Sequence, residues 1–185
     1  MITTIARVTS VVLVSMIVSG AGSGCSTAPK SDGDRTALKM NADETLKLYK
    51  FTDPSLEANL NKAAGYAVFP AITKGGAGLG GAHGRGVVYQ DHKPVGWCDV
   101  AQGTIGLQLG GQSFSELILF QDGYALERFK RGEFALAAQA RAVAAADGAA
   151  ATAKFNDGVM VFTMAKGGLM VEASIGGQNF SYEPM

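Results

Sequence analysis

Two histidines, His83 and His92, are the residues in this chain best suited to hold a metal ion, and they are its only histidines. A hydrolytic metal site would need both imidazoles and a carboxylate such as Asp91 or Asp99. His83 lies in a glycine-rich segment, and His92 lies in an expected turn nine residues later. We interpret His83 as a hydrogen-bonded spacer and His92 as a solvated turn residue. The sequence therefore predicts no metal site.

The glycine-rich segment itself matches a nucleotide-binding pattern, with Gly76, Gly78 and Gly81 in the spacing of a dinucleotide fingerprint. A functional fingerprint opens a helix whose N-terminus receives the pyrophosphate, whereas this segment continues as turn and strand. The chain also lacks a Gly-Lys-Ser/Thr phosphate loop and a Gly-x-Ser-x-Gly elbow. We therefore expect no cofactor, no catalytic residues and no enzymatic activity.

Cations beside apolar or aromatic residues remain as functional candidates. Arginine forms paired hydrogen bonds with phosphate, and phenylalanine can dip into a membrane interface, so such clusters predict a phosphate-binding face. The candidates are Arg128, Phe129, Lys130 and Arg131 in one cluster, and Lys74, Arg85 and Lys166 in the other. The alternative is that residues 128–131 compensate a helix C-terminus while the two lysines solvate turns.

The N-terminal residues resemble a bacterial export signal. Arg7 precedes an apolar run at residues 8–18, small residues follow, and Cys25 comes directly after Gly-Ser-Gly. The run is too short to span a bilayer as a helix. We expect residues 1–24 to be a signal peptide and Cys25 to be acylated, with Ser26 favouring the outer membrane. The protein would lie on the periplasmic side of that membrane, with exposure at the cell surface as the alternative. The alternative is ordinary signal cleavage with Cys25 as a bystander.

The part after the signal is long enough for one domain with a real core. Loss of Arg7 leaves one more acidic than basic residue, so no positive field favours nucleic acid. With Cys25 acylated, Cys98 would be the remaining thiol, and we expect it to be buried beside Trp97 rather than reactive.

The elements that must position these residues are read from two related motifs, at residues 110–115 and 176–181. Each follows alternating apolar residues, so the pattern predicts one antiparallel sheet of glycine-rich hairpins. Strands are expected at residues 66–72, 77–82, 86–90, 95–100, 104–109, 114–120, 159–164, 169–175 and 180–182. Helices are expected at residues 36–50, from Asp53 to Gly65, and within 122–146, with a break at Gly132. Residues 144–153 could equally form a loosely ordered connection. The fold class is α+β, with a strongly curved or barrel-like sheet and helices on one side.

An ordered series of motifs resembles the SYLF domain family. It opens with Tyr-Ala-Val-Phe-Pro and the glycine-rich segment, and it runs through residues 66–70, 74–88, 96–97, 106–110, 117–120, 125–129 and 166–169. The resemblance covers residues 36–185 and leaves 25–35 as a lipidated tether. The segment between Trp97 and Gly106 is shorter than in the family, and Gln139-Ala140-Arg141 replaces a frequent Gly-Pro.

The resemblance implies binding to acidic phospholipids, since relatives in fungi and animals bind phosphoinositides. In a bacterial envelope the ligand would be another anionic lipid, such as phosphatidylglycerol, cardiolipin or lipid A. Actin binding, known for some fungal members, is not expected there. The alternative is a scaffold lipoprotein that binds a protein partner without specific lipid binding.

Overall fold

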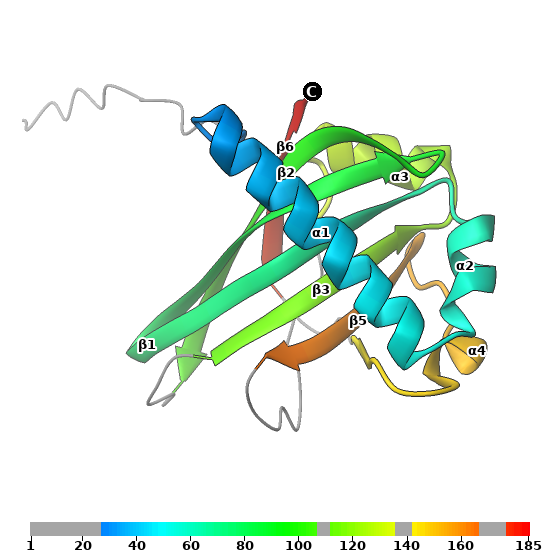
Figure 1. The fold of residues 1–185 in the computed structure, drawn as a ribbon. Coiled ribbons are helices and arrows are strands. Elements are labelled where there is room, and N and C mark those ends of the chain that lie inside the picture. Colours follow the sequence, from blue (N-terminus) through cyan, green and yellow to red (C-terminus); the bar gives the residue numbers. More distant parts are fainter. Residues whose placement is uncertain (1–26, 107–111, 136–141, 167–176) are drawn as a thin grey trace, which may run out of the picture.

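The computed structural model describes residues 27–106, 112–135, 142–166 and 177–185 (Figure 1). Its elements are α1 (Asp32–Thr52), α2 (Leu56–Lys62), β1 (Gly65–Gln90), β2 (Lys93–Gly106), β3 (Gln112–Phe120), α3 (Gly123–Lys130), β4 (Val143–Ala144), α4 (Ala149–Thr152), β5 (Val159–Lys166) and β6 (Gln178–Pro184). The sheet has the order β4-β5-β3-β1-β2-β6. Its pairs are antiparallel except β4 with β5. The predicted α+β class with an antiparallel glycine-rich sheet is confirmed.

Strand β1 doubles back on itself, so that it contributes two adjacent arms to the sheet, with its tip at the lower left of Figure 1. The arms lie so close that a Cβ on Gly84 would stand 2.7 Å from the Ala71 carbonyl oxygen. A Cβ on Gly86 would stand 2.6 Å from the Val68 carbonyl oxygen. These glycines therefore permit close approach within the sheet.

The turn expected between strands 77–82 and 86–90 was a wrong prediction. Residues Ala82, His83 and Gly84 pair in unbroken register with β2. Gly84 and Gly86 are therefore explained by the close packing of the two arms of β1 and not by a turn of the chain. The alternating residues 107, 109, 171, 173 and 175 of the repeat lie outside the described residues.

The sheet is strongly curved, which is one of the two shapes that the sequence predicted. Glu116 of β3 and Gln178 of β6 are separated by both arms of β1 and by β2, a distance of roughly 19 Å in a flat sheet. Yet Gln178 Nε2 donates a hydrogen bond to Glu116 Oε2 at 3.1 Å. The curl brings the two strands face to face, while β4 and β6 remain the open edges of the sheet over the described residues.

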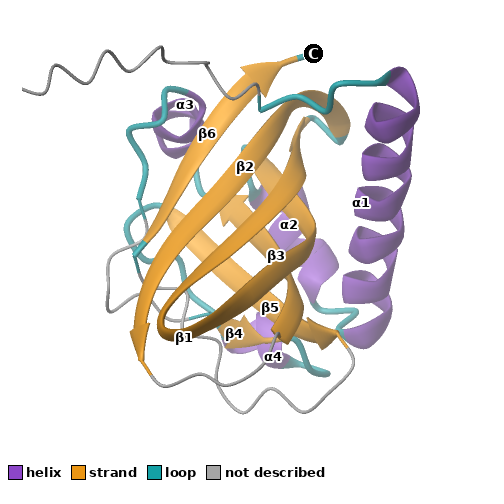
Figure 2. Cartoon of the chain, turned by 90° about the vertical axis from the view of Figure 1, so that its left-hand side faces the viewer, coloured by secondary structure: helices purple, strands orange, loops and turns teal. Residues whose placement is uncertain are grey.

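Helices cover both faces of this sheet. On the outer face α1, α2 and α4 share a core with strand residues such as Leu117 and Phe162. On the inner face α3 packs onto an aromatic cluster, opposite α1 in Figure 2. We expected helices on one side. The short α3 adds a cap to the other face, because its residues Leu126 and Phe129 face the curled interior.

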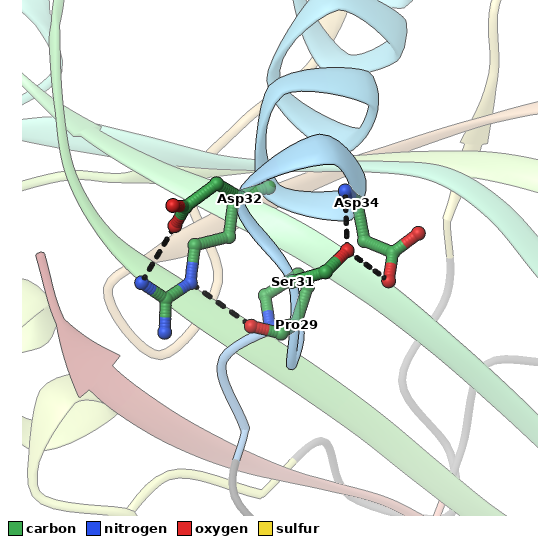
Figure 3. A network of polar contacts seen from close by, with 5 residues as sticks. Pro29, Ser31, Asp32 and Asp34 are labelled. Atoms are coloured by element: carbon green, nitrogen blue, oxygen red, sulfur yellow. Dashed lines mark hydrogen bonds and ion pairs between the residues drawn. The ribbon is translucent and has the colours of Figure 1, made fainter.

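The start of α1 is fixed by local polar contacts, shown in Figure 3. The Ser31 side chain accepts a hydrogen bond from the Asp34 backbone N–H at 3.1 Å, which caps the helix. Arg35 Nε donates to the Pro29 carbonyl at 2.9 Å. The helix therefore begins at Asp32, inside the segment expected to be a tether, because Ser31 is a better cap than the sequence pattern suggested.

The residues before α1 are also part of the fold. Thr27 and Ala28 are buried. Thr27 Oγ1 donates to Ser181 Oγ at 3.1 Å, and the Ala28 backbone N–H donates to Glu183 Oε2 at 3.0 Å. The tether proposed for residues 25–35 is therefore at most the short stretch before Thr27.

Asp53 joins three helices at one corner. It was predicted to cap the second helix, and its Oδ1 accepts from the Ser55 backbone N–H at 3.0 Å. It also accepts from the N–H groups of Gly148 and Ala150 at the start of α4. Burial alone would raise the pKa of Asp53, but these hydrogen bonds outweigh it and lower that pKa below its ordinary value.

The α3 region follows the prediction at its start and departs from it later. Asp122 caps α3 by accepting from the Ala125 N–H, and Gly132 ends the segment with a φ of 68°. The helix expected to continue to residue 146 is wrong at Val143–Ala144, which form β4. β5 offers unpaired backbone groups there, which outweigh the helix propensity of alanine. No helix in the described ranges is long and apolar enough to cross a membrane.

Candidate functional site

Phe129 does not dip into a membrane, contrary to the prediction from its basic neighbours. Its side chain is 0% exposed. Its ring lies 4.9 Å from that of Phe120, 5.2 Å from that of Phe180 and 6.1 Å from that of Phe134, measured between centroids. The Phe129 ring packs in the aromatic cluster on the inner face, because the side of α3 that carries Phe129 faces the sheet.

The cations around Phe129 all have acidic neighbours. The ion pairs are Arg128 with Asp157 at 3.7 Å, Lys130 with Glu127 at 3.0 Å and Arg131 with Glu133 at 2.8 Å. Lys130 Nζ also donates to Gln90 Oε1 at 2.9 Å. Each carboxylate cancels charge that a phosphate would need, so this end of α3 is a weak anion site.

The other predicted cluster is also divided. Lys74 is buried on the inner face of β1, and this burial lowers its pKa. Arg85 is exposed and lies 3.5 Å from Asp99. Lys166 is exposed at the end of β5. Lys74 and Lys166 pair with neighbouring positions of β3, but α3 follows the opposite end of that strand. The structure therefore does not unite the seven residues in one surface.

A surface that the sequence reasoning missed lies on the outward side of α1. Met40, Leu48 and Phe51 are exposed by 58%, 48% and 84%. At 100° per residue, Met40 and Phe51 point in nearly the same direction, and Lys47 and Leu48 lie about 20° to one side of Met40 and about 80° to the other. The expected core stripe used Ala42 and Tyr49, which are buried. A helical projection could have found the second apolar stripe opposite them.

A pocket of about 480 Å³ opens beside this stripe, between α1, α2 and the turn from β1 to β2. Its lining includes Asp43, Lys47 and Lys50 from α1, Glu57 from α2, Tyr66 from β1, and His92. Lys50 and Glu57 form an ion pair at 2.9 Å. The pocket thus carries carboxylates and ammonium groups in equal number.

Tyr66 is the buried side chain of this lining, and its position is fixed from two sides. Its ring stacks on Tyr89 with centroids 5.0 Å apart, and its hydroxyl lies 3.5 Å from His92 Nδ1. Tyr89 in turn donates to Asp43 Oδ1 at 2.6 Å. Burial, together with the charges of Asp43 and Glu57, raises the pKa of Tyr66 to about 12.

The turn that carries His92 is strained. Asp91 and His92 have φ values of 51° and 60°, in the left-handed region that favours glycine. Positive φ at both residues is the geometry of a two-residue hairpin turn whose twist matches that of the paired strands. His92 was predicted to be a solvated turn residue; it is exposed, but it also borders the pocket.

The inner face contains a buried acid that sequence reasoning did not find. Glu116 is fully buried, and burial raises its pKa to about 7, although the hydrogen bond from Gln178 lowers it in part. Among the residues that the structure describes, Glu116 Oε1 and Gln178 Oε1 have no hydrogen-bond partner. No sequence signal marks Glu116, because it occupies one position of an apolar strand.

Metal binding has no cluster to support it within the described ranges, where no group of three His, Cys, Asp or Glu residues could hold an ion. Cys98 is buried as predicted, and burial raises the pKa of its thiol well above the usual range. Cys25 lies outside the described residues.

Comparison with known proteins gives one distant relative to report, and no family model matches the chain. The chain is similar to Beta cell expansion factor A of Aeromonas veronii, with 28% identity over 153 residues. The match covers 79% of this chain and 56% of that protein. The chain thus spans little more than half the length of this curated relative.

Proposed function

We propose that this is a non-catalytic lipoprotein of the bacterial envelope, whose SYLF-like domain binds the acidic phospholipid surface to which it is anchored. The observation that carries the proposal is the exposed apolar stripe of Met40, Leu48 and Phe51 on α1. This helix begins seven residues after Cys25. The membrane-binding surface is thus assigned to α1 and not to the end of α3.

The N-terminal contacts support this arrangement. Thr27 is held against β6, and Cys25 precedes it by two residues, so an acyl chain on Cys25 would attach within about 7 Å of the folded domain. A domain held this close to a bilayer cannot stand clear of it. The start of α1 would then lie near the headgroups, and its outward stripe could lie along them.

The acyl anchor on Cys25 and the apolar stripe on α1 would contribute to membrane binding to different degrees. Two or more acyl chains on Cys25 would already anchor the protein stably, so the stripe would set how the domain lies on the bilayer rather than hold it there. Full burial of a phenylalanine contributes about 2 kcal/mol, and a lysine near an anionic surface about 1 kcal/mol. Asp43 and Glu44 offset Lys47 and Lys50 on the same helix. The stripe alone should therefore bind weakly and assist the anchor.

The resemblance of residues 36–185 to SYLF domains supports an acidic phospholipid as the ligand. Phosphatidylglycerol, cardiolipin or lipid A phosphate are the candidates in a bacterial envelope. The predicted location is the periplasmic side of the outer membrane.

The test is vesicle co-sedimentation of the chain from residue 25, with Cys25→Ser to prevent acylation. We expect weak retention on anionic vesicles that falls as salt rises through physiological strength. Leu48→Ser combined with Phe51→Ser should reduce retention several-fold. The matched control is Tyr124→Ser on α3, a side chain that is 70% exposed and should be neutral. Equal retention of all variants, or none on any vesicle, would overturn the proposal.

The pairing of Arg128, Lys130 and Arg131 with acids favours a second candidate. It is a scaffold lipoprotein, in which the stripe on α1 binds a protein partner of the envelope. In that case the Leu48 and Phe51 variants would leave vesicle retention unchanged but would lose a partner that is cross-linked to position 51 in cells.

A further inference from the structure

We propose that the pocket between α1, α2 and the β1–β2 turn binds a zwitterionic headgroup that carries a primary amine and a phosphate, of the phosphoethanolamine class. The inference rests on the proposed function and goes beyond it, because it gives the membrane-facing surface a zwitterionic lipid contact in addition to the acidic phospholipids proposed above. It is carried by the charges that the pocket brings together and by the rigid way in which they are held.

The amine would bind to Asp43 and would compete with Lys50, which is paired with Glu57 at 2.9 Å. Both carboxylates border the pocket, and both act on the buried Tyr66, whose pKa their charges help to raise. An ammonium group in this field gains charge-assisted hydrogen bonds to carboxylate oxygens. The Tyr66 ring edge and the His92 ring provide an aromatic wall beside it.

The phosphate would bind to Lys47. Over the described residues Lys47 forms no ion pair, whereas Lys50, one turn further along α1, is paired with Glu57. Lys47 is also exposed on the side of α1 that carries the apolar stripe. A phosphate bound there would leave the rest of a lipid directed toward the same side as Phe51.

The site is built before any ligand arrives. Asp43 is held by the Tyr89 hydroxyl, Tyr89 stacks on Tyr66, and Tyr66 meets His92 on a strained two-residue turn. Strained backbone of this kind persists where the surroundings hold it, often at binding sites. Side chains held in this way lose little conformational freedom on binding.

The arrangement also defines what should not bind. An anion without an amine would meet Asp43 and Glu57 as like charges. A quaternary amine has no N–H to donate to these carboxylates, and one buried tyrosine edge is not the cage of rings that such an amine needs. Selectivity should therefore follow the order phosphoethanolamine, then phosphocholine, then glycerol phosphate.

The experiment titrates the Cys25→Ser chain from residue 25 with O-phosphoethanolamine, phosphocholine, ethanolamine and glycerol phosphate, with the His92 ring signals followed by NMR. We expect phosphoethanolamine to bind at least about tenfold more tightly than the other three, a difference of about 1.4 kcal/mol. Lys47→Gln and Asp43→Asn should each weaken it by a similar factor. Asparagine at position 43 can still accept from Tyr89, so the pocket should stay intact.

Lys39→Gln is the control, because Lys39 lies on α1 outside the pocket lining. Equal affinity for all four probes, no binding of phosphoethanolamine, or an equal loss in the Lys39 variant would each overturn the inference.

Vesicle co-sedimentation separates failure of this inference from failure of the proposed function. Anionic vesicles that still retain the Lys47 variant would leave membrane binding in place without the pocket. Binding of the soluble headgroup without vesicle retention would mean that the ligand is a free metabolite of the same chemistry.

Discussion

At the scale of single residues, the sequence could place a side chain in the core or on the surface only when the opposing element was known. Phe51 and Phe129 both follow a basic residue on a helix. Phe129 is fully buried because α3 faces an aromatic cluster, whereas Phe51 is 84% exposed because the sheet lies on the other side of α1. Cys98 was placed correctly, since its strand is buried on both faces. Glu116 could not be found, because its burial depends on the curl of the sheet.

Glu116 gives a prediction about pH. Its folded pKa of about 7 lies above the ordinary value of 4.5, so between these values the folded state binds more protons than the unfolded state. The free energy of unfolding should therefore fall as pH rises from 4.5 through 7, by about 3 kcal/mol in total. Glu116→Gln should remove this loss and stabilise the protein above pH 7. Urea unfolding of both proteins from pH 5 to 8 checks it, and parallel pH profiles would contradict it.

At the scale of elements, the composition predicted glycine-rich strands but not how one of them folds back. The two arms of β1 are visible only when Gly84 and Gly86 are seen against Ala71 and Val68. Alternating apolar and polar side chains predict that a segment is a strand. Which residue lies opposite each glycine depends on pairing between segments that are distant in the sequence. Helix ends marked by a capping residue, such as Asp122, were predicted well, because a cap acts within one turn. The start of α1 was misplaced by four residues, since Ser31 was assigned to the tether.

The close approach of the arms predicts unequal effects of adding one methyl group. Gly86→Ala should destabilise the fold by at least about 2 kcal/mol, because its Cβ would overlap the Val68 carbonyl and the Phe69 ring. Gly103→Ala is the matched control on β2, where a Cβ would meet nothing within 4 Å. It should be neutral or slightly stabilising. Thermal melting of the two variants measures the difference, and equal melting temperatures would mean that the arms do not pack this way.

At the scale of the whole molecule, α1 connects the features on which the proposed membrane binding rests. Its start is fixed near the N-terminal segment, its outward side carries the apolar stripe, and its second half borders the pocket. None of this followed from the motifs, which lie mainly in the sheet. The sequence predicted the membrane as partner through the N-terminal signal and the family resemblance. The surface itself required knowing which side of α1 the sheet leaves open.

The anchor is tested by intact-mass analysis of the protein isolated from membranes. The mature chain should begin at Cys25 and carry acyl groups, and it should partition into detergent. Cys25→Ala should lose the acyl mass and appear in the soluble fraction. A wild-type protein that is soluble and has an unmodified mass would contradict the prediction.

The contacts of Thr27 and Ala28 with β6 also impose an order of events on the life of the chain. Ala28 meets Glu183, a residue 155 positions later, so this contact cannot form until almost all of the described chain has been synthesised. If the chain is exported as we propose, its N-terminal residues cross the membrane early and find their place in the fold last. An enzyme that processes Cys25 would have access to it for the whole of translocation. The proposed modification of Cys25 could therefore precede the contact of Thr27 with β6, which is among the last long-range contacts to form.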